Sequence, residues 1–275
     1  MPSPMEFRSR WVLVTGASSG LGREIARHLA RDHGANLIIA ARRRSRLEEL
    51  ARELEQEAKV QVVTVQADLS REDDVERLFR EATDGREVYA VILNAGITCF
   101  GEHHALAWED ISRMLSLNVT STVRLVSLFV PHLLETRQSG GVLLVSSLAG
   151  VVPVPYQAAY SGTKGFLINF GRCLWHELRA DDVSVTTFVP GGISTELLDI
   201  HGLSKHFGHK NPMVMPADAC ARLAVRALQR RRYMYVPGLL NRASLLLADL
   251  LPRRLSTTVI GAEYRKALAT ARGDG

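Results

Sequence analysis

The sequence predicts a single-domain α/β fold built on a doubly wound, seven-stranded parallel sheet. Short, almost wholly apolar runs bounded by turn residues alternate with segments of helical periodicity, which is typical of a parallel sheet covered by helices. Glycine-rich and polar segments follow directly after these runs, where such a sheet binds its ligand. No linker or internal repeat divides the chain, so residues 1–275 are expected to form one domain.

Each expected strand is aliphatic or β-branched on both faces, as strands buried between two layers of helices are. The strands are expected at Trp11–Thr15, Asn36–Ala41, Val60–Gln66, Val88–Leu93, Val142–Ser146, Val183–Val189 and Arg232–Val236. Helices are expected between them. Two of these are long: Trp108–Thr136, interrupted in character near Asn118, and Gln157–Ala180, which follows a proline-rich turn.

The composition is that of an ordinary globular protein, with 46% hydrophobic and 23% charged residues. The net charge is +5, but the arginines are scattered and form no single basic stripe, so nucleic acid is not an expected partner. Cys99, Cys173 and Cys220 form neither a CxxC pair nor a disulfide framework. With no apolar run that reads as a signal peptide or a membrane span, we expect a cytoplasmic protein with reduced thiols.

A glycine-rich turn joins the first expected strand to the next helix. Glycine permits positive φ and a close backbone approach, and the helix N-terminus offers free N–H groups to a pyrophosphate. The predicted cofactor contacts in this turn come from Gly16, Ser18, Ser19, Gly20, Leu21 and Gly22. Taken alone, the motif also fits an ordinary tight βα turn.

The end of the second expected strand distinguishes the two nicotinamide dinucleotides. An acidic residue about twenty positions past the glycines would bind the ribose 2′-OH of NAD, whereas here Ala41 is followed by Arg42 and Arg43. Arginine pairs with a 2′-phosphate and stacks on adenine. The alternative, a solvated helix N-terminus, places positive charge where it opposes the helix dipole. We therefore expect NADP(H) as the cofactor.

Two further segments are expected to contact the cofactor. Asp68, followed by Leu69, comes just after the third strand and either accepts from the adenine amino group or caps the next helix. The small residues Asn94, Ala95 and Gly96 end the fourth strand and let the chain pass close to the cofactor.

Tyr160 and Lys164 are four residues apart at the start of a long expected helix, so both project from one face. A nearby ammonium favours the phenolate and would bring the tyrosine pKa from about 10 toward a useful acid–base range. Ser147, at the end of the preceding strand, is placed to hydrogen-bond a substrate oxygen. Taken alone, a tyrosine and a lysine at this spacing are more often structural.

Together these motifs resemble the signature set of the short-chain dehydrogenase/reductase family, in order and at familiar spacings. The set is Thr-Gly-x-x-x-Gly-x-Gly at 15–22, Asn-Ala-Gly at 94–96, Asn118, Ser147, Tyr-x-x-x-Lys at 160–164, and Pro190-Gly191 followed by Thr195. The match extends from Arg10 to Pro237. The resemblance implies a Rossmann fold, hydride transfer between NADP(H) and a carbonyl or secondary alcohol, and a homodimer or homotetramer.

The resemblance also implies a catalytic tetrad of Asn118, Ser147, Tyr160 and Lys164. Tyr160 would exchange the hydroxyl proton, and Ser147 would orient the carbonyl. Lys164 would bind the nicotinamide ribose and lower the pKa of Tyr160, while Asn118 would hold a water in the proton relay.

Other family positions concern the cofactor. The residues implied to line the nicotinamide amide and the pyrophosphate are Pro190, Gly191, Ile193 and Thr195. Arg42 matches the position that marks NADP preference.

Two segments are expected to select the substrate. Residues 194–215 are apolar with movable side chains, which suits a lid over a lipophilic ketone or alcohol. The C-terminal extension, residues 237–275, carries leucines at roughly helical spacing beside arginines. It either walls the substrate pocket and subunit interface or contacts an anionic membrane surface. Asp249 and Pro252 exclude a spanning helix and favour the pocket wall.

No metal site is expected, because the spacing of His201, His206 and His209 suits no helical ligand pair. Two rival functions fit the sequence: a ketoacyl-carrier reductase, whose acidic carrier would need a basic rim at the active-site mouth, and a non-catalytic NADP(H)-binding redox sensor. The intact Ser147 and Tyr160 favour an enzyme.

Overall fold

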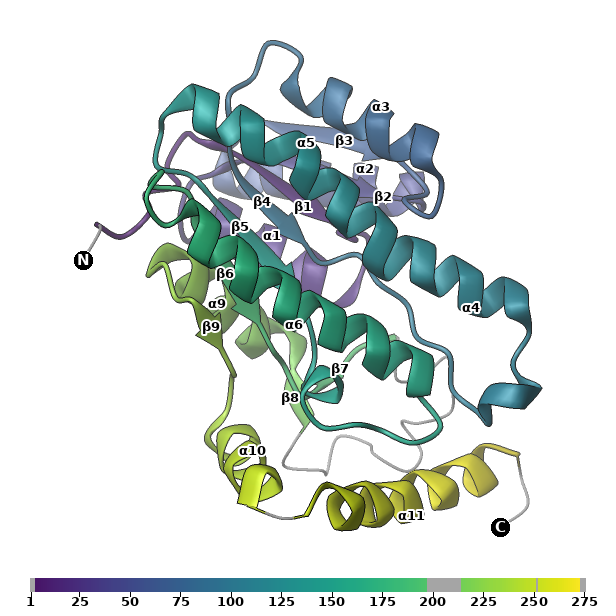
Figure 1. Ribbon diagram of the computed structural model, residues 1–275. Coiled ribbons are helices and arrows are strands. Elements are labelled where there is room, and N and C mark those ends of the chain that lie inside the picture. Colours follow the sequence, from purple (N-terminus) through teal and green to yellow (C-terminus); the bar gives the residue numbers. More distant parts are fainter. Residues whose placement is uncertain (1–2, 197–213, 251, 273–275) are drawn as a thin grey trace.

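The computed structural model describes residues 3–196, 214–250 and 252–272 (Figure 1). Its centre is a seven-stranded parallel sheet in the order β3-β2-β1-β4-β5-β6-β9. The strands are β1 (Trp11–Thr15), β2 (Asn36–Ala41), β3 (Val62–Gln66), β4 (Val88–Leu93), β5 (Gly141–Val145), β6 (Ser184–Phe188) and β9 (Met234–Tyr235). The predicted doubly wound sheet and its Rossmann-like topology are confirmed.

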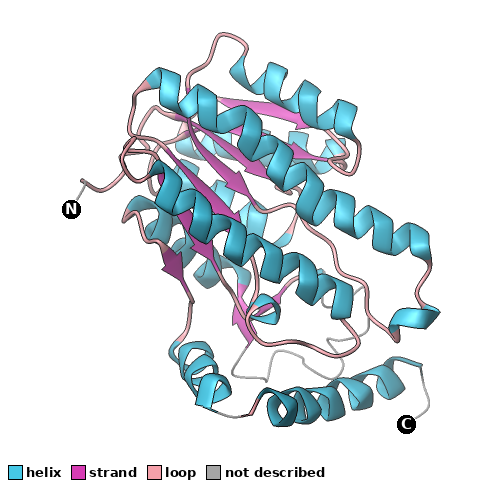
Figure 2. Cartoon of the chain, in the orientation of Figure 1, coloured by secondary structure: helices cyan, strands magenta, loops and turns pink. Residues whose placement is uncertain are grey.

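Helices cover both faces of the sheet (Figure 2). One layer holds α1 (Gly20–Arg31), α2 (Arg44–Ala58) and α9 (Ala217–Gln229), and the other holds α3 (Glu72–Thr83), α5 (Ser121–Thr136) and α6 (Ala158–Leu178). Successive strand side chains point to opposite faces, so Val12 and Val14 pack in the first layer and Leu13 in the second. Both faces are buried, which is why the strands read as continuous apolar runs.

The long helical segment is interrupted where the sequence predicts. α4 (Trp108–Leu115) passes into a π-helical turn, Ser116–Thr120, and then into α5. Asn118 lies in this turn and is 1% exposed. π-helical turns occur frequently at functional sites, where they re-aim a side chain. The whole run is long and apolar enough to cross a membrane, but half of its apolar stretch is buried in the fold, as in a core helix.

The C-terminal extension forms two helices. α10 (Leu239–Leu250) and α11 (Arg253–Arg272) run along the lower edge of the molecule in Figure 1, with Pro252 between them. Asn241 of α10 is 3% exposed, and Ala267 of α11 is fully buried. The extension therefore packs against the rest of the chain.

Most of the predicted lid, residues 197–213 with His201, His206 and His209, lies outside the described residues. Its two ends pair as a parallel ladder between β7 (Gly192–Ser194) and β8 (Val214–Pro216). This small sheet was not predicted, because strands of three residues carry no periodic signal.

Candidate active site

The carboxyl ends of β1 and β4 meet where the strand order reverses, the position at which open α/β sheets bind ligands. The Oγ1 atom of Thr15 accepts hydrogen bonds from the backbone N–H of Asn94 at 3.0 Å and of Ala95 at 3.1 Å. The Asn94 side chain donates to the Thr15 carbonyl at 3.0 Å. These bonds hold the glycine turn beside the segment that follows β4.

The glycine turn leaves no room for side chains on its inner surface. A Cβ atom on Gly16, whose φ is +69°, would lie 2.9 Å from Asn94 Nδ2, and one on Gly22 would lie 2.4 Å from the Gly16 carbonyl oxygen. At Gly20, where α1 begins, a Cβ would lie 3.1 Å from Thr195 Cγ2. The backbone itself therefore forms the surface, as close contact with a pyrophosphate requires.

The N-terminus of α1 is open on the same side. Its N-cap residue, Ser19, makes no side-chain capping bond. The first-turn N–H groups thus remain available to an anion at the positive end of the helix dipole. The glycine turn and this helix end fit a dinucleotide pyrophosphate.

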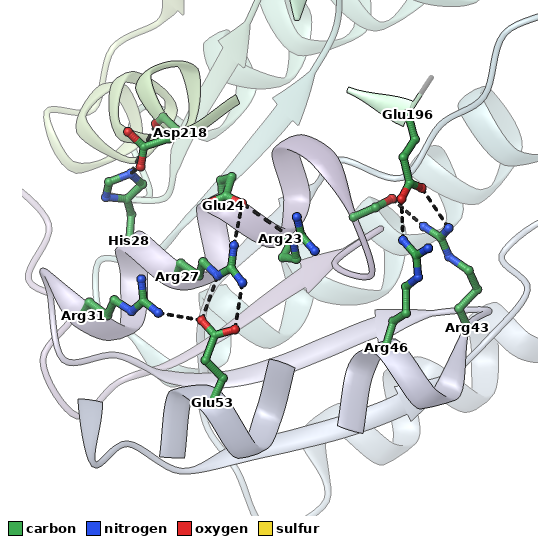
Figure 3. A network of polar contacts seen from close by, with 11 residues as sticks. Arg23, Glu24, Arg27, His28, Arg31, Arg43, Arg46, Glu53, Glu196 and Asp218 are labelled. Atoms are coloured by element: carbon green, nitrogen blue, oxygen red, sulfur yellow. Dashed lines mark hydrogen bonds and ion pairs between the residues drawn. The ribbon is translucent and has the colours of Figure 1, made fainter. Parts of the chain in front are cut away.

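The two arginines after β2 have different surroundings. Arg43 donates from Nε and Nη2 to the Ser18 hydroxyl at 3.2 and 3.1 Å, and from Nη1 to Glu196 at 2.9 Å. Arg46 bonds the other carboxylate oxygen of Glu196 (Figure 3). Arg42 lines an open hollow of about 580 Å³ together with Asp68. Arg43 therefore lies against the glycine turn, and Arg42 lies by the end of β3.

Asp68 bonds the turn that precedes α3. Its Oδ1 accepts from the N–H and hydroxyl of Ser70 at 3.2 and 2.7 Å, and its Oδ2 accepts from Arg113 at 3.2 Å. Burial raises the pKa of Asp68, but the Ser70 bonds and the nearby arginines outweigh it, so the pKa falls below its ordinary value. The N-cap of α3 is Arg71, so the alternative that Asp68 caps that helix is wrong. Leu69 packs in the core beneath α3.

The four predicted catalytic residues come from separate parts of the chain. Ser147 follows β5, Tyr160 and Lys164 lie in the first turns of α6, and Asn118 lies in the π-helical turn. Gly96 lies against two of them: a Cβ there would be 3.2 Å from Asn118 Oδ1 and 3.5 Å from Lys164 Nζ. The structure thus gathers the predicted residues beside the segment after β4.

Asn118 fastens that segment to α6. Its Oδ1 accepts from the Ile97 N–H at 2.9 Å, and its Nδ2 donates to the Ile97 carbonyl at 2.9 Å and to Thr163 Oγ1 at 3.2 Å. Both N–H bonds of the carboxamide are used by protein groups. A water in the predicted relay would have to bind another part of this residue, such as the free lone pair of Oδ1.

Lys164 is 5% exposed and donates from Nζ to the Val145 carbonyl at 2.9 Å. Burial lowers the pKa of Lys164 to about 8. Its Nζ lies 5.7 Å from the centroid of the Tyr160 ring. The lysine is therefore close to the phenol, and its pKa lies nearer to neutral pH than that of an exposed lysine.

The expected lowering of the Tyr160 pKa is not what the structure shows. Burial raises the pKa of this phenol above its ordinary value, and the Ser147 hydroxyl offsets only part of the rise. Desolvation disfavours the phenolate more than the neighbouring groups favour it. At neutral pH the Tyr160 phenol is protonated.

The segment after β6 connects the two halves of the site. The Pro190 carbonyl accepts from the Leu148 N–H at 2.8 Å, next to Ser147. Ile193 lies in β7, and Thr195 packs on Gly20 of the glycine turn. The predicted residues 190–195 thus run from the Ser147 turn to the start of α1.

Several residues near the site were not predicted. One is Asn241 of α10, which packs against the predicted Gly191: a Cβ on Gly191 would lie 2.7 Å from Asn241 Nδ2. Tyr264 of α11 places its ring centroid 6.1 Å from that of Phe100. Glu196 was predicted only as part of the substrate lid, residues 194–215. Phe100 and Tyr264 belong to no periodic apolar pattern, so the sequence gives only a weak signal for this aromatic pair.

Comparison with known proteins agrees with this geometry. Residues 10–202 match the family model described as short chain dehydrogenase. The very-long-chain 3-oxoacyl-CoA reductase of Homo sapiens is 30% identical over 194 residues, which are 69% of this chain and 61% of that protein. The chain thus spans about three fifths of the length of the first curated relatives it matches.

Two solved structures carry the likeness over most of the chain. A short-chain dehydrogenase from Sphingobium yanoikuyae in complex with NADPH is 29% identical, with a TM-score of 0.76 over 88% of this chain and 96% of that one. A 3-ketoacyl-(acyl-carrier-protein) reductase from Brucella melitensis complexed with NADH is 26% identical, with a TM-score of 0.71 over 84% and 95%. This chain therefore belongs to the short-chain dehydrogenase family.

Proposed function

We propose that the protein reduces lipophilic ketones with NADPH, or oxidises the corresponding secondary alcohols with NADP⁺. The observation that carries the proposal is the gathering of Ser147, Tyr160 and Lys164 near Asn118, beside the glycine turn. The bound nicotinamide supplies or accepts the hydride, and the chain supplies orientation and the proton.

Tyr160 acts as the acid in reduction. As the carbonyl carbon gains the hydride, its oxygen takes the proton from the Tyr160 phenol, which leaves an alcohol and a phenolate. The raised pKa keeps the phenol protonated at neutral pH, ready to donate. Ser147 donates its hydroxyl hydrogen to the same oxygen and fixes the carbonyl. Lys164, with its pKa near 8, is largely protonated at neutral pH, and its positive charge stabilises the phenolate.

NADP(H) is the proposed cofactor because two arginines, Arg42 and Arg43, follow β2, where the ribose is expected. Arg43 lies against the glycine turn through Ser18, and Arg42 lines the hollow next to the end of β3. No carboxylate follows β2 to bind a 2′-hydroxyl. The S. yanoikuyae relative was solved with NADPH, and the B. melitensis relative was solved with NADH.

A lipophilic substrate is proposed on two grounds. One is an aromatic pair near the predicted catalytic residues, and the other is the human relative, whose name specifies a very-long-chain 3-oxoacyl-CoA. Phe100 and Tyr264 form an aromatic pair close to the loop that leads into α6. The extension 237–275 supplies one of these rings, which supports a pocket wall over a membrane contact as its principal role.

The test is a substrate screen with the purified protein. NADPH oxidation is followed by nicotinamide absorbance with a small ketone, a fused-ring ketone, and 3-oxoacyl thioesters of coenzyme A and of acyl carrier protein. We expect the fused-ring ketone or the long-chain coenzyme A thioester to be reduced. Turnover of the carrier-protein thioester alone would identify a ketoacyl-carrier reductase. NADPH binding without turnover of any substrate would identify a redox sensor.

A further inference from the structure

We propose that Tyr264 of α11 is a specificity-determining residue: its ring, paired with Phe100, forms the wall that selects ketones with a bulky, uncharged, apolar group. Arg265 and Tyr156 hold this wall in place. The inference rests on the proposed carbonyl reduction and names the residues of that site which choose its substrate.

The first step is that α11 is seated on the turn before α6. Gly261 faces Pro155, where a Cβ would lie 3.1 Å from Pro155 Cγ. Gly261 and Ala267 are buried, and Leu268 is 8% exposed. A helix with one side buried in this way has a defined orientation.

The second step is that Tyr264 lies on the seated side. It is three residues after Gly261, so the two share one face of the helix. Its ring meets the Phe100 ring edge to face, with the centroids 6.1 Å apart and an interplanar angle of 67°. Such pairs are a favoured arrangement of aromatic rings. Phe100 lies three residues after Ile97, whose N–H donates to the Asn118 side chain. The wall therefore joins α11 to the predicted catalytic region.

The third step concerns the charge of Tyr264. Burial, together with the smaller effect of a Tyr160 phenolate, raises the pKa of Tyr264 to about 12. Tyr264 is therefore uncharged at neutral pH. It presents a flat, uncharged surface to a substrate whose carbonyl meets Tyr160.

The fourth step is a clamp between α11 and the turn before α6. Arg265 donates from Nε to the Tyr156 hydroxyl at 2.9 Å. Tyr156 has a φ of +66°, and its carbonyl accepts from the Gly101 N–H at 2.9 Å. A tyrosine keeps a left-handed backbone only where its surroundings fix it. The clamp therefore ties Tyr264, Phe100 and the turn before Tyr160 into one unit.

The substrate class follows from the surface. The two aromatic rings bury the apolar area of a neutral group that contacts them. They offer no polar or charged group that would neutralise a charge on the substrate. We expect a fused-ring ketone with its carbonyl at Tyr160 to extend to the Tyr264 ring, and we expect a ketone of four carbons to fall short of it.

The experiment compares Tyr264→Ala and Tyr264→Phe on a fused-ring ketone and on 2-butanone, with saturating NADPH. For the fused-ring ketone, Tyr264→Ala is expected to raise KM about tenfold or more, since the ring contact contributes roughly that factor. For 2-butanone, kcat/KM should change less than about twofold. Tyr264→Phe, which keeps the ring, should restore the KM of the fused-ring ketone to within about threefold. Arg265→Gln should give a smaller rise, because it loosens the wall without removing it.

The control is Lys266→Ala, next along α11, which removes an exposed pair with Glu263 and should leave both substrates unchanged. NADPH affinity and the unfolding temperature are measured for every variant. Equal losses on both ketones with Tyr264→Ala, or no rescue by Tyr264→Phe, would overturn the proposal.

Binding separates this proposal from the proposed function. Calorimetry measures the affinity of the fused-ring ketone for the NADP⁺ complex of each variant. If no ketone is reduced but Tyr264→Ala weakens ketone binding, the wall stands and the proposed reaction is wrong. If ketones are reduced but Tyr264→Ala leaves this affinity unchanged, the reaction stands and the wall is wrong.

Discussion

Glu196, just after β7, accepts a hydrogen bond at 2.9 Å from the guanidinium of Arg43, just after β2 (Figure 3). Hydrogen bonds from Arg46 and then from Arg43 lower the pKa of Glu196 to about 2, so its carboxylate is ionised throughout the physiological range. The same Arg43 is predicted to bind the 2′-phosphate of NADP. The Glu196 carboxylate thus binds the same guanidinium that the 2′-phosphate of the cofactor would bind.

Removing this internal anion should strengthen NADPH binding. Glu196→Gln frees Arg43 and Arg46 for the 2′-phosphate, and half-exposed ion pairs of this kind contribute about 0.2–1 kcal/mol. We expect the Kd of NADPH to fall by up to about fivefold, and the Kd of NADH to stay the same. Titration of nicotinamide fluorescence measures both. Weaker NADPH binding in the variant would show that Glu196 organises the arginines for the cofactor instead of competing with it.

Cofactor choice should depend on the two arginines after β2. The unmodified protein is expected to bind NADPH at least about tenfold more tightly than NADH, since a desolvated arginine–phosphate pair contributes on the order of 2 kcal/mol. Arg42→Asp combined with Arg43→Ala should abolish or reverse this ratio. The measurement is kcat/KM for each cofactor with one ketone. Equal values for the two cofactors in the unmodified protein would exclude the assignment.

The carboxamide of Asn118 should matter for both stability and activity. Asn118→Ala leaves the N–H and carbonyl of Ile97 without their partners, which costs about 1–3 kcal/mol when such groups are buried. Denaturant unfolding should show a loss of that size, and kcat should fall because the segment after β4 moves. Ser127→Ala, which removes an exposed hydroxyl bond on α5, is the control and should change neither quantity. An unchanged unfolding free energy in Asn118→Ala would contradict the fastening role.

The predicted homodimer or homotetramer should involve the exposed apolar residues of α4 and α6. Phe166 is 43% exposed and stacks on Phe170, and Trp108 on α4 is 65% exposed. Phe166→Glu should lower the mass found by light scattering at micromolar concentration, because it places a charge in an apolar contact. Arg80→Glu, on the exposed side of α3, should not. A monomeric mass for the unmodified protein would refute the prediction.

The sheet could be predicted because its strands are buried on both faces. Runs such as Val88–Leu93 have only one stable placement, between two helical layers, and each predicted strand lies within two residues of the observed bounds. The interruption near Asn118 was also predicted from a local change in the helical pattern. The glycine turn at 16–22 could be predicted because the residues of a single turn determine its conformation.

Other features depend on contacts between distant segments. Glu196 meets Arg43 across 153 positions, and Tyr264 meets Phe100 only because α11 folds back on the turn before α6. No local pattern specifies such contacts. The sign of the Tyr160 pKa shift was wrong for a related reason: spacing places Lys164 near the phenol, but burial, which decides the shift, is a property of the folded chain.

The central claim is that Tyr160 transfers the proton in a hydride-transfer reaction. Tyr160→Phe keeps the ring and removes only the hydroxyl, so it should leave the Kd of NADPH nearly unchanged. The most direct measurement is kcat of this variant under saturating ketone and NADPH, with the Kd of NADPH as the control for folding. The account predicts that turnover is abolished while NADPH still binds. A Tyr160→Phe protein that keeps more than about a tenth of the unmodified kcat would contradict it, because general acid catalysis accounts for about a hundredfold or more.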